Sequence, residues 1–385
     1  MSLIAREEEV QILENFYSSD RPEFLAMYGR RRVGKTYLVR QFFEKKEGVF
    51  FNVTGAKKGS MKEQIKHFIN QIGKVFYDGV SLQPKKNWDE TFELLTTVIE
   101  KQVQKDKKVI LFFDELPWMA TRNSRLLEAL DYYWNQHWSN NKNIKLIICG
   151  SSASWIIEKV INNKGGLHNR ITKQIHLEPF NLSQTKQFLK SMNVDLNDRQ
   201  VLLLFMVMGG IPYYLSHVEK GISASQAVEK LAFSKKSFLL NEFDNLFSSL
   251  FDDSEIYIKI IKILAEHPYG VGERALLEKL GVHAVGGSGH KKLKELEQTG
   301  FIMSFLPLFN KKKGTYYRLI DEYTLFYLKW IDPIKNSLQK ESIDHGNWQA
   351  IQMTPAWYSW QGYAFETVCY KHILKIKRAL DLTAV

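Results

Sequence analysis

The chain has 385 residues, 44% of them apolar, which is too long for one ordinary hydrophobic core and supplies material for two or three. We therefore expect a multidomain globular protein. Lys and Arg outnumber Asp and Glu by 53 to 42. This excess of positive charge favours a polyanionic partner such as a nucleotide or a nucleic acid, with a basic protein that lacks such a partner as the alternative.

Cysteine usage and hydropathy argue against two classes of protein. Cys149 and Cys369 lie far apart, and Cys149 is in an apolar run typical of a buried strand, so we expect no disulfide framework and a reducing compartment. The N-terminus turns acidic within a few residues, and the longest apolar run, VLLLFMVMGGIPYYL, is too short and too broken to span a bilayer. We predict a cytoplasmic protein without a signal peptide.

The first motif lies in residues 24–43. Gly29, Gly34, Lys35 and Thr36 fit G-x-x-x-x-G-K-[ST], between the apolar stretch FLAMY and the helix-like segment TYLVRQFF. Such a loop turns its backbone N–H groups toward phosphate oxygens, and the helix N-terminus adds partial positive charge. We expect Lys35 to bind the outer phosphates of ATP and Thr36 to bind Mg²⁺. The predicted nucleotide contacts are Gly29, Arg32, Val33, Gly34, Lys35, Thr36 and Tyr37.

The second motif follows the apolar run Val109–Phe113, which is typical of a parallel strand buried on both faces. The run ends in Asp114 and Glu115. With the phosphate loop, this pattern predicts that Asp114 binds Mg²⁺ through water and that Glu115 polarises the attacking water. Taken alone, the run is equally compatible with a strand that ends in solvent.

The third motif is the apolar segment IKLIICGSS, which brings Ser151 and Ser152 to the end of another strand. Open parallel sheets bind ligands at the carboxyl ends of their strands, so we expect these residues to face the γ-phosphate and assign Ser151 to the catalytic group. A Gly-Ser turn without a functional role is the alternative.

At this point the chain resembles the AAA+/STAND-type P-loop ATPases, and more narrowly a prokaryotic and archaeal-type family of them. The resemblance rests on YGRRRVGKT at Tyr28–Thr36, the Asp114–Glu115 strand end, GSS at Gly150–Ser152 and GGIPYYL at Gly209–Leu215. The early IAREEEVQIL is similar to the family's opening Gly-Arg-Glu box, with Ala5 in place of the glycine. The resemblance places Arg6 and Glu7 in the nucleotide pocket, with Ala5 as a departure from the family's pattern.

The resemblance implies an α/β fold with a five-stranded parallel sheet, in which the Asp114 strand flanks the phosphate-loop strand, followed by a small helical lid. It places Pro212 in the lid near the adenine; the residues alone indicate only a helix breaker and a turn. The expected domains are an ATPase core (1–180), a helical lid (181–248), a winged helix-turn-helix (249–335) and the start of a nuclease-like domain (336–385).

The arginines have separate interpretations. A phosphate loop binds phosphates mainly through its backbone, so the side chains of Arg30, Arg31 and Arg32 are expected to form salt bridges or to contact a partner. A transition-state arginine must approach from outside the loop, often from another subunit. Arg170 is the candidate, because the family has a Gly-Arg-like pair in this region; here Asn169 replaces the glycine. An ordinary surface arginine is the alternative.

The second half predicts a DNA-binding module. Three short helices ending in GGSGHKKLKELEQTGFI precede two β-rich runs joined by NKKKG, which is the order of a winged helix. Residues 286–330 hold eight Lys or Arg against four acids. We predict DNA contacts through residues 286–318, with His290, Lys291, Lys292, Lys294 and Lys311–Lys313 near phosphates. A packing or protein-contact module is the alternative.

The aromatic segment WYSWQGYAFETVCYKHILKIKRAL is similar to the first part of a PD-(D/E)XK nuclease domain, with Glu366 matching the acidic residue of its first helix. No later Asp with Glu-x-Lys follows, so we expect an incomplete or degenerate domain without nuclease activity. The sequence thus predicts a Mg²⁺-dependent ATPase that acts as a nucleotide-driven switch or remodeller, DNA-associated and possibly homo-oligomeric. The alternative is a nucleotide-gated DNA- or protein-binding scaffold with negligible turnover.

Overall fold

The computed structural model describes residues 3–162, 165, 167, 169–251, 253–281, 287–307, 314–340 and 347–382. Their contacts form two compact units. The first unit runs to Glu178 without residues 31–33, and the second combines residues 31–33 with the chain from Pro179 onward. None of the helices in the described ranges has the length and apolar character that a membrane crossing requires.

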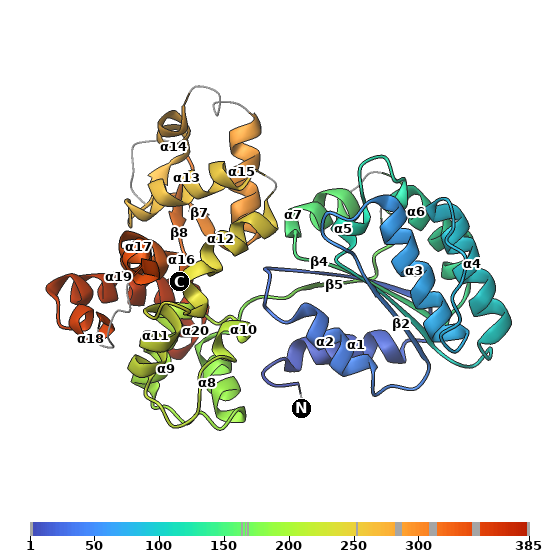
Figure 1. Ribbon diagram of the computed structural model, residues 1–385, viewed down its shortest axis with the longest axis horizontal. Helices are drawn as coiled ribbons and strands as arrows, with labels where there is room; N and C mark the ends of the chain where they lie inside the picture. Colours follow the sequence, from blue (N-terminus) through green and yellow to red (C-terminus); the bar gives the residue numbers. More distant parts are fainter. Residues whose placement is uncertain are drawn as a thin grey trace. The chain divides into compact units, whose positions relative to one another are not determined.

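A five-stranded parallel sheet forms the centre of the first unit (Figure 1). Its strands are β1 (Glu23–Tyr28), β2 (Val49–Thr54), β3 (Val109–Asp114), β4 (Ile144–Gly150) and β5 (Lys173–His176). The predicted α/β class with a parallel sheet is therefore confirmed. Every residue of β3 and β4 is buried, as expected for continuous apolar runs covered on both faces.

The strand order corrects one expectation. The sheet runs β2-β3-β4-β1-β5, so β1, which leads into the phosphate loop, has β4 and β5 as neighbours rather than the Asp114 strand β3. β4 comes later in the chain than β3 but pairs with both β1 and β3. Inserting β4 between them places the residues that follow Gly150 between the phosphate loop and Asp114.

Helices cover both faces of this sheet (Figure 1). They are α1 (Glu7–Ser18), α2 (Lys35–Phe43), α3 (Met61–Phe76), α4 (Trp88–Gln102), α5 (Leu116–Met119), α6 (Leu126–Gln136) and α7 (Ala153–Ile156), with short turns at Trp138–Asn140 and Ile157–Ile161. One apolar core joins α3, α4 and α6 to alternate sheet residues such as Phe51 and Phe113. On the other face, Phe43 of α2 contacts Phe16 of α1 and Phe50 of β2.

The register of the parallel strands brings their carboxyl ends to one edge. Tyr28 of β1 lies opposite Gly150 of β4 and His176 of β5, while Thr54 of β2 lies opposite Asp114 of β3. The residues that follow these strands therefore meet at the same edge, which is where open α/β sheets bind ligands.

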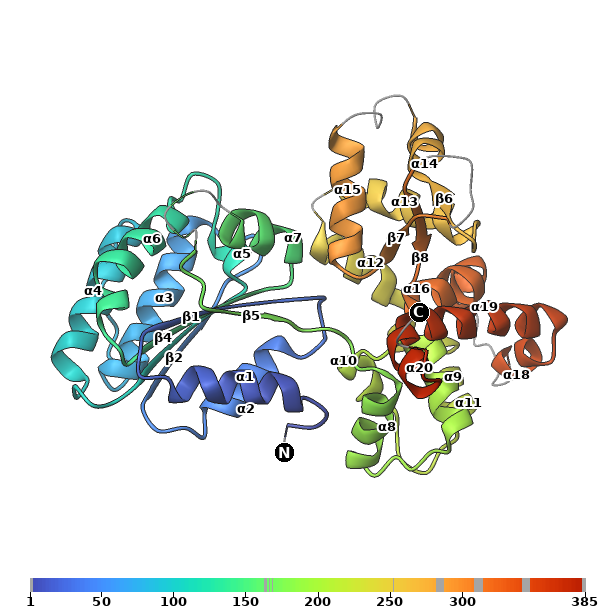
Figure 2. The same cartoon turned by 180° about the vertical axis from the view of Figure 1, so that it is seen from behind.

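The second unit is mainly helical (Figure 2). Its helices are α8 (Leu182–Ser191), α9 (Asp198–Met208), α10 (Pro212–Leu215), α11 (Ala224–Ala232), α12 (Phe238–Leu250), α13 (Ser254–Ala265), α14 (Glu273–Leu280), α15 (Gly287–Gln298), α16 (Glu322–Phe326), α17 (Lys335–Lys340), α18 (Asn347–Gln352), α19 (Pro355–Lys371) and α20 (Ile373–Ala379). Short helical turns at Tyr327–Ile331 and Asp332–Ile334 continue α16. Helix α9 packs against α8, α11, α16 and α19.

This unit also contains a three-stranded antiparallel sheet, with one strand before α14 and α15 and two strands after them. Its strands are β6 (Val271–Gly272), β7 (Ile302–Phe305) and β8 (Tyr316–Leu319), in the order β6-β8-β7. The two predicted β-rich runs are therefore strands β7 and β8. The separate lid, winged-helix and nuclease-like divisions of residues 181–385 stay predictions.

The packing of α19 differs from what its aromatic sequence suggests. Trp357 and Trp360 are buried, and their rings lie 5.0 Å apart in a stacked pair. Phe365 and Tyr370, of the same aromatic segment, are 48% and 44% exposed. Apolar residues occur all around this helix, so the sequence pattern does not tell its buried face from its exposed face.

Candidate functional site

The phosphate loop has backbone geometry that depends on its glycines. Gly29 has a φ of +146°, and a Cβ atom there would lie 2.3 Å from the carbonyl oxygen of Leu177, so no side chain fits. Gly34, the N-cap of α2, has a φ of +96°. Side chains cap α3 and α4, through Ser60 and Asn87, whereas no side chain caps α2. The first-turn N–H groups of α2 therefore lack the side-chain acceptor that most helix starts have.

Lys35, the first residue of α2, is buried at the sheet edge. Its Nζ donates hydrogen bonds to the carbonyl oxygens of Gly29 at 2.8 Å and Arg30 at 2.9 Å, and to Ser151 Oγ at 3.3 Å. Because Lys35 is 5% exposed, its charge acts in a region of reduced solvent screening. The loop thus holds a buried cation next to its own backbone.

Asp114 forms the second part of the site. Thr36 Oγ1 donates a hydrogen bond to Asp114 Oδ2 at 2.9 Å, and Thr54 Oγ1 at the end of β2 donates to the same oxygen at 3.4 Å. Asp114 is 2% exposed. The Thr36 hydroxyl and the Asp114 carboxylate therefore lie next to each other. Both have oxygen atoms that can bind a metal ion, and oxygen is the type of ligand that Mg²⁺ prefers.

Glu115 and Ser151 form the third part. The backbone N–H of Ser151 donates to Glu115 Oε2 at 3.0 Å, and Ser151 Oγ donates to Glu115 Oε1. Glu115 has a left-handed backbone with a φ of +50°, so the chain turns sharply directly after β3. Ser151 also accepts the hydrogen bond from Lys35, and it therefore connects the predicted phosphate-binding lysine to the predicted base.

The surroundings shift the pKa values of two neighbouring groups in the direction of their neutral forms. Burial raises the pKa of the Cys149 thiol well above its usual value, and the nearby Asp114 carboxylate raises it further. At the end of β5, burial lowers the pKa of His176, and the charge of Lys35 lowers it as well, against the opposing effect of Glu178. The His176 ring stacks on Tyr28 with centroids 5.1 Å apart. Neither residue was predicted as part of the site.

The opening box contains a strained position. Ala5, which stands where the resembling family has glycine, is buried and has a φ of +58°. Arg6 is also buried and donates to the carbonyl oxygen of Glu178 at 2.8 Å and to Glu9 Oε1 at 3.2 Å. Burial lowers the pKa of Arg6, and the Glu9 charge opposes this. Glu7 is exposed.

Other predicted nucleotide contacts occupy different environments. Val33 is buried, while Tyr37 on α2 is 49% exposed. Arg170 is exposed in a turn and has no hydrogen bond or ion pair with Lys35, Glu115 or Ser151. Burial raises the pKa of Asp131 on α6, and the nearby charge of Arg170 only partly opposes this. Pro212 is the first residue of α10 in the second unit. The nucleotide and catalytic roles of these residues stay predictions.

Arg32 belongs by its contacts to the second unit. A guanidinium nitrogen lies 2.8 Å from Glu242 Oε2 in an ion pair, although the N–H is not aligned for a hydrogen bond. The guanidinium carbon is 4.6 Å from the centre of the Tyr213 ring and 5.2 Å from that of Phe238. The expectation that loop arginines form salt bridges holds for Arg32, whose partner no sequence motif had identified.

Much of the basic charge assigned to DNA binding is paired within the protein. His290 contacts Glu273 at 2.9 Å, and Lys291 contacts Glu295 at 3.9 Å. The Lys292 ammonium lies 5.3 Å from the centre of the Tyr257 ring, and Lys294 is exposed. Lys311, Lys312 and Lys313 lie outside the described residues. DNA binding through residues 286–318 therefore stays a prediction, with Lys294 as its most available cation in the described part of α15.

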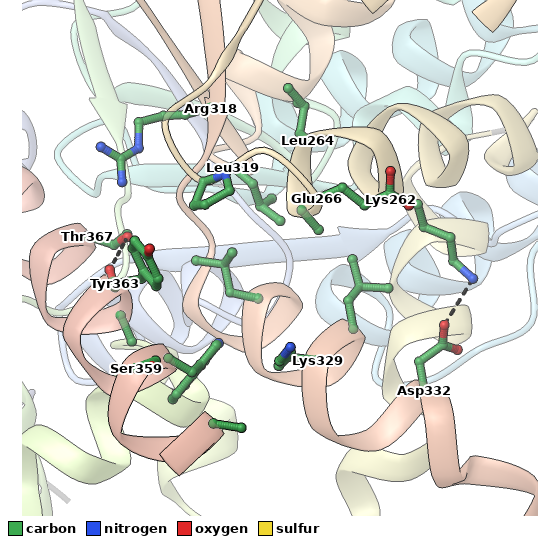
Figure 3. A pocket seen from close by; sticks show the side chains of 17 residues that line it. Lys262, Leu264, Glu266, Arg318, Leu319, Lys329, Asp332, Ser359, Tyr363 and Thr367 are labelled. Atoms are coloured by element: carbon green, nitrogen blue, oxygen red, sulfur yellow. Dashed lines mark hydrogen bonds and ion pairs between the residues drawn. The ribbon is translucent and has the colours of Figure 1, made fainter. Parts of the chain in front are cut away.

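A cavity of about 560 Å³ lies in the second unit, among α13, β8, the turn after α16, and α19 (Figure 3). Lys262 on its wall is paired with Asp332 at 3.0 Å. Arg318 is also on the wall, 7% exposed, 3.6 Å from Glu366 and 4.3 Å from the centre of the Tyr370 ring. This burial removes Arg318 from the predicted DNA surface. No residue of the phosphate loop lines the cavity.

The sequence had not singled out Thr54 or Glu242. Thr54 ends the segment FFNVT at the same sheet edge as Asp114, so a polar residue at the end of a strand with alternating buried residues was the available signal. Glu242 lies inside a helix, and nothing in its local sequence distinguishes it from a surface carboxylate. Across the described ranges, no group of three or more His, Cys, Asp or Glu residues could hold a metal ion by itself.

Comparisons with other sequences agree with this site. Residues 3–218 match the family described as an ATPase domain predominantly from Archaea. The chain is 28% identical over 378 residues to an uncharacterized protein of Methanocaldococcus jannaschii, covering 97% of this chain and 78% of the relative. An uncharacterized ATP-binding protein of the same organism is 25% identical over 309 residues, covering 68% of this chain and 83% of the relative.

Solved structures show the same fold. The Walker-type ATPase of Pyrococcus abyssi superimposes with a TM-score of 0.58 at 20% identity, covering 85% of this chain and 96% of that protein. The ORC2 protein of Aeropyrum pernix, in its ADPNP–ADP complexes, gives a TM-score of 0.54 at 14% identity, covering 88% and 96%. Since the family match spans more than half of the chain and includes the whole phosphate-loop site, this protein belongs to the family of ATPase domains found predominantly in Archaea.

Proposed function

We propose that the chain binds ATP with Mg²⁺ at the phosphate loop and hydrolyses it, and that it uses this cycle as a molecular switch. The observation that carries the proposal is the connection of Lys35, Ser151 and Glu115 beside the Thr36–Asp114 pair. One sheet edge thus holds a cation for phosphate, oxygen ligands for a metal and a carboxylate for water.

The residues fit a nucleotide and its metal. Helix α2 starts at a left-handed glycine without a side-chain cap, so its first N–H groups and the partial positive charge of its N-terminus suit a phosphate. Thr36 and Asp114 bring two oxygen atoms within 2.9 Å of each other, enough for a Mg²⁺ that keeps most of its ligands as water and phosphate oxygens. The relative with an ATP-binding name and the ORC2 nucleotide complexes give independent support.

The roles of the chain's own groups follow from this fit. Mg²⁺–ATP supplies the γ-phosphoryl group that is transferred to water, with part of its charge neutralised by the metal. Lys35 donates hydrogen bonds to the outer phosphates in place of those it gives to the loop carbonyls. Thr36 and Asp114 hold the metal, Asp114 through water. Glu115 orients the attacking water. Ser151 holds the Glu115 carboxylate and the Lys35 ammonium in fixed positions relative to each other.

A second candidate function has its own support. Both carboxylate oxygens of Glu115 accept hydrogen bonds from Ser151, which leaves the carboxylate less available to a water molecule. A protein in which this arrangement persists would bind nucleotide with negligible turnover, as a nucleotide-gated scaffold. A measurement of phosphate release with ATP in excess separates the two, because the scaffold would bind ATP and release almost no phosphate within a time in which the ATPase completes many cycles.

The decisive experiment compares the wild type with Lys35→Ala and Glu115→Gln. We expect Lys35→Ala to lose most of its Mg²⁺–ATP affinity, because it removes the buried charge that faces the phosphates. Glu115→Gln keeps the affinity and loses turnover by roughly 100-fold or more, because an amide cannot accept a proton from water. Hydrolysis by Glu115→Gln at the wild-type rate would show that Glu115 is not the base.

Three further parts of the proposal concern the class of switch, the binding of DNA and the role of a neighbouring subunit. The family resemblance supports a STAND-type switch that associates with DNA through a winged helix at residues 249–335. Arg170 is proposed to complete the site of a neighbouring subunit, since it has no contact with Lys35 or Glu115 in its own chain. Mixing Arg170→Ala protein with Lys35→Ala protein tests this, because only mixed assemblies with a complementing arginine regain hydrolysis.

A further inference from the structure

We propose that Glu242, on helix α12, is a positioning residue for nucleotide binding, because it anchors Arg32 and so fixes the backbone of the phosphate loop. The inference rests on the proposed function, since it assigns a role at the same phosphate site. It concerns a residue more than 200 positions away from the loop in sequence.

The anchor of Arg32 is built from several groups of the second unit. Besides its ion pair with Glu242, the guanidinium lies over the rings of Tyr213 and Phe238. Tyr213 and Phe238 also contact each other, with ring centroids 5.6 Å apart. Aromatic faces attract a cation, and this attraction adds to the ion pair. The Arg32 side chain is 20% exposed, so most of it is enclosed by these partners.

Glu242 is a strong anchor because it is buried. Its side chain is 1% exposed, and Tyr214 Oη donates a hydrogen bond to Glu242 Oε1 at 2.7 Å. A carboxylate removed from water needs both hydrogen bonds and an opposite charge to offset its desolvation. Tyr214 gives the first and Arg32 the second, so the loop arginine is part of what allows Glu242 to be charged inside the fold.

The backbone of Arg32 shows why the loop needs such an anchor. Arg32 has a φ of +71°, in the left-handed region that is unfavourable for any residue with a Cβ atom. It lies two residues before Gly34, within the segment whose N–H groups must turn toward phosphate. A side chain held at its far end by Glu242 offsets the local strain and keeps the loop in this conformation. Without the anchor, the loop relaxes, and nucleotide binding has to restore its shape.

The proposal predicts a distinctive pattern among variants at position 32. Arg32→Ala loses the anchor and keeps the strain, whereas Arg32→Gly loses the anchor but adopts a positive φ without a steric penalty. We expect Arg32→Ala and Glu242→Gln each to weaken Mg²⁺–ADP binding by about 5- to 150-fold, the usual range for coupling between sites. Arg32→Gly should bind more tightly than Arg32→Ala, and adding Glu242→Gln to Arg32→Gly should change affinity little.

Isothermal titration of the full chain with Mg²⁺–ADP measures these affinities. The matched control is Glu219→Gln, which removes the same charge from an exposed ion pair with Lys230 and should leave binding unchanged. If the wild type binds and Glu242→Gln binds equally well, the inference is overturned while the proposed function stands. If the wild type itself binds no nucleotide, the proposed function fails.

The comparison stays informative if Glu242→Gln does not fold. Arg32→Ala and Arg32→Gly both remove the Arg32 guanidinium from Glu242, so they share the loss of that ion pair and differ in the freedom of the loop backbone. Melting temperatures without nucleotide establish that the two variants are equally folded. Equal Mg²⁺–ADP affinities for these two would then overturn the proposal.

Discussion

Ser151 donates one hydrogen bond to each carboxylate oxygen of Glu115, from its backbone N–H at 3.0 Å and from its hydroxyl. The same hydroxyl accepts a hydrogen bond from Lys35 Nζ at 3.3 Å. Ser151 can contact both residues because β4, whose last residue precedes it, lies between β1, which leads into the loop before Lys35, and β3, which ends directly before Glu115. The orientation of Glu115 is therefore tied to the position of Lys35.

Replacing Ser151 with Ala tests this connection. The variant keeps the backbone N–H to Glu115 and loses the hydroxyl that links the two charged groups. We expect kcat for ATP hydrolysis to fall by at least about tenfold, with little change in nucleotide affinity, because the remaining groups still bind phosphate. Ser191→Ala, at an exposed position at the end of α8, is the control. A kcat equal to that of the wild type would remove Ser151 from the catalytic assignment.

The Thr36–Asp114 pair predicts a strict dependence on a divalent cation. Chelation with EDTA should abolish hydrolysis, and added Mg²⁺ should restore it. The Mg²⁺ concentration for half-maximal rate should be at least roughly tenfold higher in Asp114→Asn than in the wild type. The substitution removes the negative charge that attracts the metal and keeps an oxygen that accepts the hydrogen bond from Thr36. Asp89→Asn, at an exposed site on α4, is the matched control. A Mg²⁺ requirement identical in Asp114→Asn and wild type would contradict this role.

The parts of the site that lie in single motifs could be predicted from the sequence. The loop glycines, Lys35 and the Asp114–Glu115 strand end are local patterns whose flanking apolar runs fix them at the ends of strands. Once the sheet is parallel, these ends must meet at one edge. The general fold class and the position of the site follow from that local information.

The relations between distant segments could not be read in the same way. Buried strands are all apolar, so their composition does not state which of them are neighbours, and β4 rather than β3 lies beside β1. Glu242 resembles any helical carboxylate until the fold encloses it with Arg32 and Tyr214. The pairing of strands and side chains that are distant in sequence depends on the packing of the whole chain, so a short motif cannot predict it.

Substitutions that reverse the charge of lysines test the proposed DNA contact. We expect DNA affinity to fall steeply with salt, and Lys294→Glu to weaken binding to all sequences alike, because an exposed ammonium on α15 neutralises phosphates rather than reading bases. The triple change of Lys311, Lys312 and Lys313 to Glu should act in the same direction. Lys190→Glu on α8 is the control for charge alone. Unchanged affinity of both reversals in a low-salt filter-binding titration would exclude residues 286–318 as the DNA contact.

The last prediction concerns Glu366, the residue that matches the first-helix acid of a PD-(D/E)XK nuclease. In the structure its carboxylate lies 3.6 Å from an Arg318 nitrogen, and the buried Arg318 also stacks on Tyr370 of the same helix. A nuclease site needs further carboxylates around a metal, and the described residues hold no such cluster. Glu366 is thus engaged in packing α19 against β8.

We therefore expect no cleavage of plasmid or linear DNA by this chain with Mg²⁺ or Mn²⁺. Glu366→Gln should lower the melting temperature by only a few degrees, because an ion pair with one partly exposed partner contributes about 1 kcal/mol or less. Arg318→Met should cost more, since it removes a buried guanidinium from both Glu366 and the Tyr370 ring and leaves the carboxylate without its cation. Metal-dependent nicking that is lost in Glu366→Ala would contradict the packing role and would mean that further metal ligands come from elsewhere in the chain or from another subunit.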